Sequence, residues 1–306
     1  MIKRTIHLGS PCRLNVKDAQ LRIKYSHVKG QEGILDKKVP IEDIAYLVLE
    51  HPQISITHPT LTALLAHKAV LISCNDKMMP MGMMLNLDSH DVQQEHFRYQ
   101  INASTPLKKQ LWQQTIEYKI LNQAAHLEYW DVPHQNLLTL AKHVRSGDTD
   151  NREAVASYYY WGHLFPASWE FSRKREGRAP NNLLNYGYTI LRAITARALS
   201  GSGLLPTLGI FHKNRYNAYA LADDVMEPYR PFVDFIVRSI VSRTSHVSEL
   251  NKELKAELLN LPIQDVIINN KKRPLMIAMQ ETCASLVRCL RKDSRKITYP
   301  TFYANK

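Results

Sequence analysis

Acidic residues and one histidine in the second half of the sequence are the residues best suited to chemistry. Glu153 stands between SGDTDNR and AVASYYYW, and His212 ends the loop-like segment LPTLGIFH. The pair Asp223 and Asp224 follows in ALADDVMEPYRPFVD. One imidazole together with carboxylates forms a mixed nitrogen and oxygen donor set that suits Mg²⁺ or Mn²⁺. Such an ion can polarise a phosphodiester and activate a water or a 3′-hydroxyl.

Spacing alone leaves ordinary roles open for these residues. If Asp150 or Asn151 caps the helix that follows, Glu153 lies in its first turn, where a carboxylate also complements the helix dipole. His212 and Asp224 are 12 residues apart, about three helical turns, so a chain reversal near residues 214–217 is needed to bring them together. Adjacent aspartates on a helix point about 100° apart, so at most one faces a given site. Glu227, one turn further on, could support either aspartate.

The charge distribution favours a nucleic-acid partner. The chain has 40 Lys and Arg against 28 Asp and Glu, a net charge of +12, and residues 101–306 carry 28 basic and 18 acidic side chains. A localised positive field of this size attracts phosphate backbones. Two groups of basic residues lie near the candidate site, where a solvated surface is the alternative role. They are Arg173, Lys174, Arg175 and Arg178 in SRKREGR, and Lys213 and Arg215 beside His212.

Several classes of protein are excluded by what the sequence lacks. It contains no Walker A loop, G-x-G-x-x-G, H-E-x-x-H or G-x-S-x-G motif, so nucleotide hydrolysis and acyl transfer lack their usual supports. The four cysteines are scattered and form no Cys-x-x-Cys pair. The first residues have no apolar core of a secretory signal, and no stretch approaches the ~20 apolar residues of a membrane span. We therefore expect a cytoplasmic protein with reduced thiols and no membrane partner.

Hydrophobic periodicity predicts an α+β protein. Residues 1–85 contain short alternating or continuously apolar runs, such as IAYLVLE and AVLISCN, and predict a small β-rich, β-sandwich-like domain. The pattern changes near residue 90, and residues 86–105 predict a helical connector. Residues 106–306 show apolar groups at helical spacing and predict a larger all-α domain with a basic tail.

Several segments, in order, resemble the CRISPR adaptation integrase, the first universal CRISPR-associated protein. The resemblance lies in IEDIAYLVLEHPQISIT, REAVASYYYWGHLF, NNLLNYGY, the G-x-x-H element and D-x-M-E-P-Y-R-P. It spans most of the chain, and MEPYRPFVD looks most like the variant of compact RNA-guided (type II) systems. The resemblance implies a metal site made of Glu153, His212 and Asp224, with Asp223 as the fallback.

The same resemblance implies a function. Members of this family join the 3′-hydroxyl ends of short DNA fragments into a CRISPR repeat by transesterification with Mg²⁺ or Mn²⁺, and they also act as metal-dependent endonucleases. The implied partners are double-stranded DNA, a second copy of the chain held through residues 1–85, a small ferredoxin-like second universal adaptation protein, and an RNA-guided effector nuclease. The alternatives are a metal-dependent nuclease of branched DNA and a non-catalytic subunit that only positions DNA.

Overall fold

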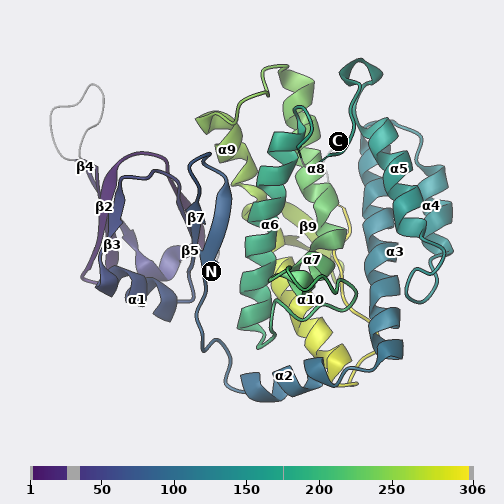
Figure 1. The fold of residues 1–306 in the computed structure, drawn as a ribbon, viewed down its shortest axis with the longest axis horizontal. Coiled ribbons are helices and arrows are strands. Elements are labelled where there is room, and N and C mark those ends of the chain that lie inside the picture. Colours follow the sequence, from purple (N-terminus) through teal and green to yellow (C-terminus); the bar gives the residue numbers. More distant parts are fainter. Residues whose placement is uncertain (1–2, 26–34, 175, 303–306) are drawn as a thin grey trace. The chain divides into compact units, whose positions relative to one another are not determined.

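The chain forms two compact units, Met1–Ser89 and His90–Lys306. The computed structural model describes residues 3–25, 35–174 and 176–302, so Arg175, predicted to bind DNA, lies outside the described residues. The first unit is rich in strands and the second in helices (Figure 1). The α+β class predicted from the sequence is therefore confirmed.

The described residues of the first unit form two four-stranded sheets. One has the order β1-β5-β7-β8, in which β8 is antiparallel to β7, and the other has the order β4-β3-β2-β6. The strands are β1 (Arg4–Leu8), β2 (Cys12–Lys17), β3 (Gln20–Tyr25), β4 (Leu35–Pro40), β5 (Ile44–Leu49), β6 (Ile54–Ile56), β7 (Val70–Cys74) and β8 (Pro80–Met84). A 3₁₀ turn, η1 (Ile41–Asp43), precedes β5, and α1 (His58–Ala66) connects β6 to β7.

One hydrophobic core joins the two sheets and α1. Alternate residues of the hairpin strands, such as Leu14 and Leu21, are buried together with Leu47 of β5, Leu64 of α1 and Leu71 of β7. The continuously apolar run of β5 is explained by its place as an inner strand, since it pairs with both β1 and β7.

In the part that the structure describes, the second unit is mainly helical but also contains one hairpin. Its helices are α2 (Gln93–Ile101), α3 (Thr105–Tyr129), α4 (Gln135–Lys142), α5 (Arg152–Leu164), α6 (Asn181–Gly201), α7 (Ala220–Met226), α8 (Arg230–Arg243), α9 (Lys252–Leu258) and α10 (Leu275–Leu290). Its 3₁₀ turns are η2 (Ala167–Trp169), η3 (Glu227–Tyr229) and η4 (Leu261–Ile263). The hairpin of β9 (Asp265–Ile268) and β10 (Lys271–Pro274) was not part of the all-α prediction.

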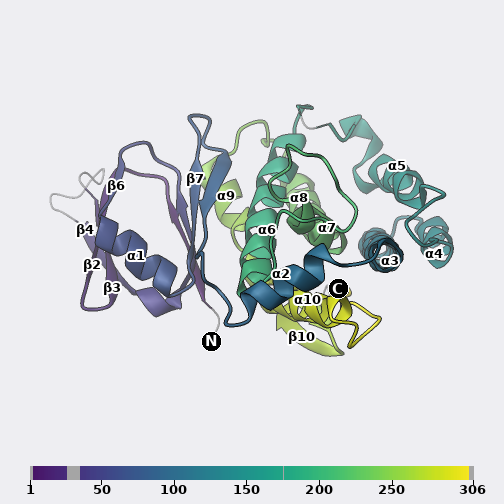
Figure 2. The ribbon, with the colours of Figure 1, turned by 60° about the horizontal axis from the view of Figure 1, so that its bottom comes forward.

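The segment predicted as a connector, 86–105, contains a helix that belongs to the second unit. The ring of His96 in α2 bonds to the carbonyl of Ser202, and the amide of Gln100 donates to the carbonyls of Leu205 and Leu208 at 2.9 and 3.0 Å. Figure 2 shows α2 alongside α10, with which it is in contact. Through Gln100, α2 holds the loop that leads to His212.

Two long helices, α3 and α6, form the middle of the second unit. Ser104 caps α3, and Leu111, Ile116, Ile120 and Leu127 are fully buried, as their helical spacing predicts. On α6, a Cβ added at Gly187 would lie 2.4 Å from Val233 Cγ1 of α8, so only glycine permits this close helix packing.

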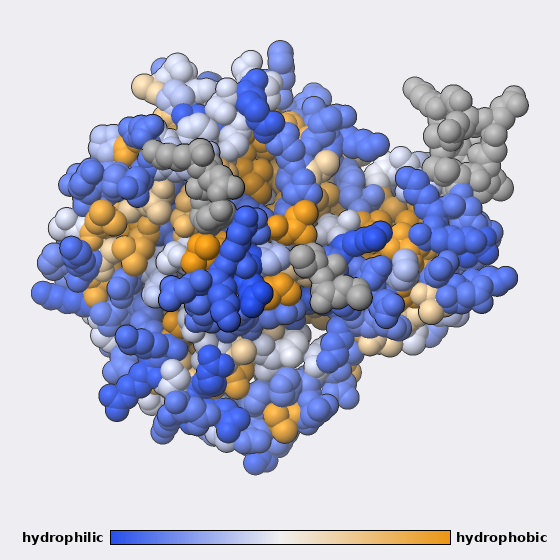
Figure 3. Space-filling model, turned by 180° about the vertical axis from the view of Figure 1, so that it is seen from behind, coloured by the Kyte–Doolittle hydropathy of each residue, from blue (hydrophilic) through white to orange (hydrophobic). Residues whose placement is uncertain are grey.

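The surface of the described residues gives no sign of a bilayer-spanning helix. Within the described ranges, no helix combines the length and apolar character that crossing a membrane requires. The face drawn in Figure 3 is largely hydrophilic, with smaller hydrophobic areas between the polar side chains.

Candidate active site

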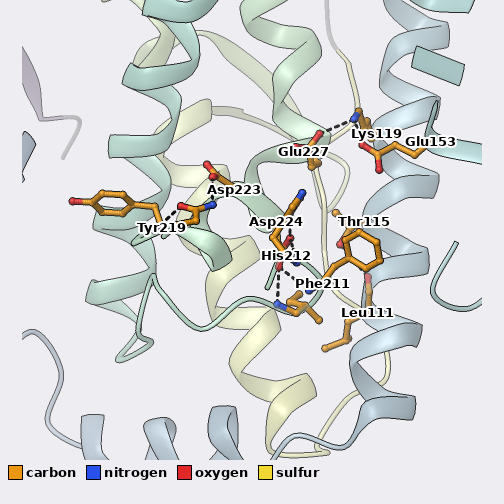
Figure 4. A network of polar contacts seen from close by, with 12 residues as sticks. Leu111, Thr115, Lys119, Glu153, Phe211, His212, Tyr219, Asp223, Asp224 and Glu227 are labelled. Carbon is orange, nitrogen blue, oxygen red and sulfur yellow. Dashed lines mark hydrogen bonds and ion pairs between the residues drawn. The ribbon is translucent and has the colours of Figure 1, made fainter. Parts of the chain in front are cut away.

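A buried lysine joins two glutamates at the centre of the second unit. The Lys119 Nζ of α3 lies 2.6 Å from Glu153 Oε1 and 2.7 Å from Glu227 Oε2 (Figure 4). The Lys119 side chain is 9% exposed, and that of Glu227 is 6% exposed. Burial by itself would lower the pKa of Lys119, but the charges of Glu227 and Glu153 outweigh it and raise the pKa above its ordinary value. The ammonium therefore stays charged between two carboxylates.

Glu153 is positioned by the start of α5. Its backbone amide and that of Arg152 donate to the carboxylate of Asp148 at 3.1 and 2.8 Å. Of the two residues considered as caps, Asn151 does occupy the N-cap position, but it adopts a left-handed conformation and its side chain makes no capping bond, so Asp148 takes that role. The placement of Glu153 in the first helical turn is confirmed.

Glu227 is fixed at the junction of α7 and η3. Arg230 Nε donates to Glu227 Oε1 at 2.7 Å, and Asn122 of α3 donates to the carbonyl of the next residue, Pro228, at 2.8 Å. Burial opposes ionisation, but Arg230 and Lys119 together lower the pKa of Glu227 to about 2. This carboxylate is therefore ionised at neutral pH, and it faces Glu153 across the Lys119 ammonium.

The loop before α7 folds back as the sequence required. A turn in which Asn217 N donates to Asn214 O brings His212 against Asp224, with 2.5 Å between His212 Nδ1 and Asp224 Oδ1. Asp224 is fully buried, and its oxygens also accept from the backbone amides of residues 210–212 at 2.6, 2.9 and 3.3 Å. Asp224 thus holds both the loop and the imidazole ring.

The electrostatics of His212 link it to both glutamates. The hydrogen bond that His212 donates to Asp224 raises the pKa of His212, burial opposes the rise, and the charges of Asp224, Glu227 and Glu153 add to it. The loop is held from its other side by Phe211, which stacks on Trp112 of α3 at a centroid distance of 4.2 Å. The His212 ring meets Trp112 edge-on, and 42% of its side chain remains exposed.

The neighbouring aspartate, Asp223, points to a different partner. Arg192 of α6 donates to its two oxygens at 2.7 and 3.1 Å, and Asn217 donates to it at 2.8 Å. Asp223, the fallback metal ligand, thus forms a bidentate ion pair with Arg192, and this pair links α6 to α7.

The predicted DNA-binding residues lie in two loops. In the first, Arg173 donates to the side-chain oxygens of Asn181 and Asn185, and its guanidinium lies 5.4 Å from the centre of the Tyr188 ring. Asn181 is buried and bonds to the backbone of Ser172, Lys174 and Arg178, which fixes the shape of this loop. Lys174 and Arg178 are exposed in it, as Lys213 and Arg215 are in the loop beside His212. Contact of these side chains with DNA stays a prediction.

The side chains of Glu153, Glu227 and His212 are of the types that bind a divalent metal ion, although they do not converge on one point. Among the described residues, no three His, Cys, Asp or Glu side chains converge closely enough to hold an ion. Glu153 and Glu227 instead share a cation, the Lys119 ammonium. Two carboxylates around a positive charge, with an imidazole in electrostatic range, are the oxygen and nitrogen donors that Mg²⁺ and Mn²⁺ accept.

Two residues of this cluster were missed or undervalued in the sequence. Lys119 was not singled out, although a lysine on the buried stripe of α3, between Ile116 and Ile120, is unusual and indicates a partner charge. Glu227 was considered only as support for an aspartate. Its position directly before Pro228, in the tight turn η3, is what directs it to Lys119.

The helical unit of this basic chain thus gathers two glutamates, a histidine and a buried lysine in one cluster. The chain matches the model of the CRISPR associated protein Cas1 family over residues 7–269. It is 39% identical over 287 residues to a CRISPR-associated endonuclease Cas1 of Neisseria meningitidis, covering 93% of this chain and 91% of that protein. The chain therefore belongs to the Cas1 family.

Solved structures agree with this fold. A casposase bound to its integration product has a TM-score of 0.79 at 19% identity, covering 97% of this chain and 92% of that one. A Cas1 protein from Thermotoga maritima has a TM-score of 0.73 at 16% identity, covering 99% and 100%. A Cas6-RT-Cas1–Cas2 complex has a TM-score of 0.71 at 20% identity, covering 96% of this chain and 35% of that one. At these identities the likeness concerns the fold.

Proposed function

We propose that this protein is a divalent-metal-dependent DNA integrase and endonuclease of CRISPR spacer acquisition. The observation that supports it most directly is the pair of glutamates, Glu153 and Glu227, held 2.6 and 2.7 Å from one buried cation beside His212. Membership of the Cas1 family and the casposase-like fold support the same reaction class.

The residues that would hold Mg²⁺ or Mn²⁺ are Glu153, Glu227 and His212. This assignment keeps two of the three ligands predicted from the sequence. Metal-binding histidines commonly donate their other ring N–H to a carboxylate, which orients the ring. Asp224 occupies that place at Nδ1 of His212, so we assign it to holding the imidazole, and the predicted ligation by Asp224 gives way to Glu227 in the proposal.

The bound ion would supply Lewis-acid activation of the phosphodiester and of the attacking oxygen. The chain's residues provide the rest. Arg173 and the exposed basic side chains of both loops bind backbone phosphates and align the DNA. Asp224 keeps the proton on Nδ1 of His212, which leaves Nε2 as the donor atom. In the joining step the 3′-hydroxyl oxygen forms a new bond to phosphorus while the original ester bond breaks, so no nucleotide is consumed.

Hydrolysis and transesterification differ only in which oxygen attacks. Water in place of the 3′-hydroxyl would give the endonuclease activity, including cleavage of branched DNA. The partners of this reaction are double-stranded DNA, a second copy of the chain, the small ferredoxin-like adaptation protein and an RNA-guided effector nuclease, acting together in the cytoplasm. A Cas2 protein accompanies Cas1 in one structure of the same fold.

A strand-transfer assay tests the proposal. Purified protein and its small partner are mixed with a short duplex carrying 3′-hydroxyls and a supercoiled plasmid bearing a leader and repeat, with Mn²⁺, Mg²⁺ or EDTA. We expect joining that requires the metal and falls at least ~100-fold in Glu153→Gln and Glu227→Gln. Asp223→Asn should retain most of the activity, because Asp223 faces Arg192. Equal joining by Glu153→Gln and the unaltered protein would leave only a DNA-positioning role.

A further inference from the structure

Lys119 is a buried charge to which neither the predicted chemistry nor the proposed ligand set gives a role. Its ammonium lies where the two glutamates converge, within 2.7 Å of each. Arg230 is the second cation at Glu227. Two carboxylates therefore face two positive side chains, and the cluster is already neutral. A divalent ion added to this arrangement would leave an excess of positive charge in a largely buried place, which costs energy.

Of these two cations, Lys119 is the one with freedom to move. Arg230 is held by its bond to Glu227 and by the Tyr188 ring, whose centre lies 4.6 Å from the guanidinium. Lys119 has a flexible four-carbon stem, whereas the guanidinium of Arg230 is a rigid plane. A small displacement of the Lys119 side chain would free the space between Glu153 and Glu227 without unfolding a helix.

The structure provides a second position for this ammonium. A pocket of about 160 Å³ is lined by Lys119 together with Gln123, Ser157 and Asp234. Gln123 lies one helical turn beyond Lys119 on α3 and is 3% exposed, and its Oε1 has no hydrogen-bond partner among the described residues. A buried acceptor without a donor is costly and rare. The Lys119 ammonium is a donor that could satisfy it.

The same pocket is also lined by two arginines. Arg173 and Arg230 bring positive charge to its wall. The acids on the same wall are Glu227, which is already bonded to Arg230, and Asp234, whose pKa burial raises to about 7. An ammonium that enters beside the two guanidiniums is therefore favoured when a further anion is present to share the positive charge. In a basic DNA-processing protein, the anion that fits this chemistry is a backbone phosphate of the bound strand.

We propose that the Lys119 ammonium occupies the position of the metal ion between Glu153 and Glu227, and that this ammonium moves into the adjoining pocket when the metal and a DNA phosphate bind. This inference rests on the proposed function, since it takes the two glutamates as metal ligands. It makes Lys119 a positioning residue. It also requires metal and DNA to strengthen each other's binding, because linkage between two sites is reciprocal.

Metal affinity is the first test, measured by titrating Mn²⁺ and following the free ion by electron paramagnetic resonance. Lys119→Met removes the competing charge and keeps most of the length of the side chain, and we expect at least tenfold tighter Mn²⁺ binding. The matched control is Lys142→Met, which removes the same charge from an exposed position on α4. Adding a duplex with 3′-deoxy ends, which cannot react, should tighten Mn²⁺ binding by the unaltered protein but not by Lys119→Met.

A second test uses the unaltered protein and does not depend on how the variant folds. Acetylation of Lys119 by an acetylating reagent, quantified by peptide mass spectrometry, should be slow in the protein alone and faster with Mn²⁺ and the unreactive 3′-deoxy duplex together. Acetylation of Lys142 should not change. A Lys119 that reacts equally in both conditions would overturn the proposal.

The outcomes separate this inference from the function on which it rests. If Lys119→Met and Lys142→Met bind Mn²⁺ equally, while Glu153→Gln loses binding, the metal site stands and the role of Lys119 is refuted. If Glu153→Gln binds Mn²⁺ as well as the unaltered protein does, the proposed metal site itself is wrong.

Discussion

Replacing Gly209 with alanine tests how tightly the His212 loop is held. A Cβ at Gly209 would lie 2.5 Å from the carbonyl oxygen of His212 and 2.9 Å from Asp224 Oδ2. Ordinary contacts begin near 3.4 Å, so the loop must shift by about 0.9 Å. A shift of that size would lengthen the bonds from the amides of Ile210 and Phe211 to Asp224, now 2.6 and 2.9 Å, to the limit of hydrogen bonding.

The expected effects follow from these distances. Overpacking of this kind costs about 1–3 kcal/mol of unfolding free energy. A reacting group displaced by about 1 Å can lose roughly 100-fold in rate. We therefore expect Gly209→Ala to fold with reduced stability and to join DNA about 100 times more slowly at saturating Mn²⁺.

The matched control is Gly162→Ala in α5, the helix that carries Glu153. No atom lies within 4 Å of a Cβ placed there, so the variant should keep its joining rate and gain about 0.5–1 kcal/mol of stability. The assays are strand transfer and chemical denaturation of both variants. A Gly209→Ala protein with the unaltered rate and stability would refute the argument that Asp224 and this loop position His212.

Two further predictions concern stability. Burial and the charge of Arg238 lower the pKa of His126 to about 3 from 6.5, so the folded protein keeps it neutral while the unfolded chain takes up a proton as the pH falls. Protonation of His126 in the unfolded chain should by itself lower the unfolding free energy by about 2 kcal/mol between pH 7 and pH 5. Asp234, whose pKa burial raises to about 7, acts in the opposite direction over the same range, so the test is the difference between two proteins. In urea titrations, His126→Asn should gain about 2 kcal/mol relative to the unaltered protein on going from pH 7 to pH 5, and equal pH dependences would contradict the prediction. Gly187→Ala should lose about 1–3 kcal/mol by overpacking, because its Cβ would lie 2.4 Å from Val233 Cγ1. Adding Val233→Ala should recover part of that loss in thermal melts, whereas additive losses would show that the two positions do not meet.

The fold class could be predicted because hydrophobic periodicity reports burial directly. The buried stripe of α3 and the continuous apolar run of β5 are examples. The hairpin of β9 and β10 was not predicted, since its strands have only four residues each and KKR is a polar sequence. The predicted connector became α2 of the second unit because Gln100 finds its partners about 105 residues away along the chain.

The sequence predicted most residues of the candidate site but not which of their side chains contact each other. The contact of His212 with Asp224 followed from a turn that the sequence permitted, and Glu153 could be placed in the first turn of α5. The partner of Glu153 could not be predicted, because Lys119 lies 34 positions earlier in the chain. No local sequence pattern encodes a contact at that sequence separation. The division of roles between Asp223 and Asp224 depends on Arg192 of another helix, which is again a tertiary contact.

The hydrogen bonds of Asn181 have an evolutionary consequence. Its amide bonds to backbone groups of Ser172, Lys174 and Arg178 rather than to their side chains. The loop therefore keeps its shape whichever side chains it carries at 174 and 178. Natural variants can therefore change the charge of this loop, and with it the DNA binding proposed for these residues, while the hydrogen bonds that fold the loop stay the same. Selection on the proposed DNA affinity can act at these positions without altering the buried side chains of the helical unit.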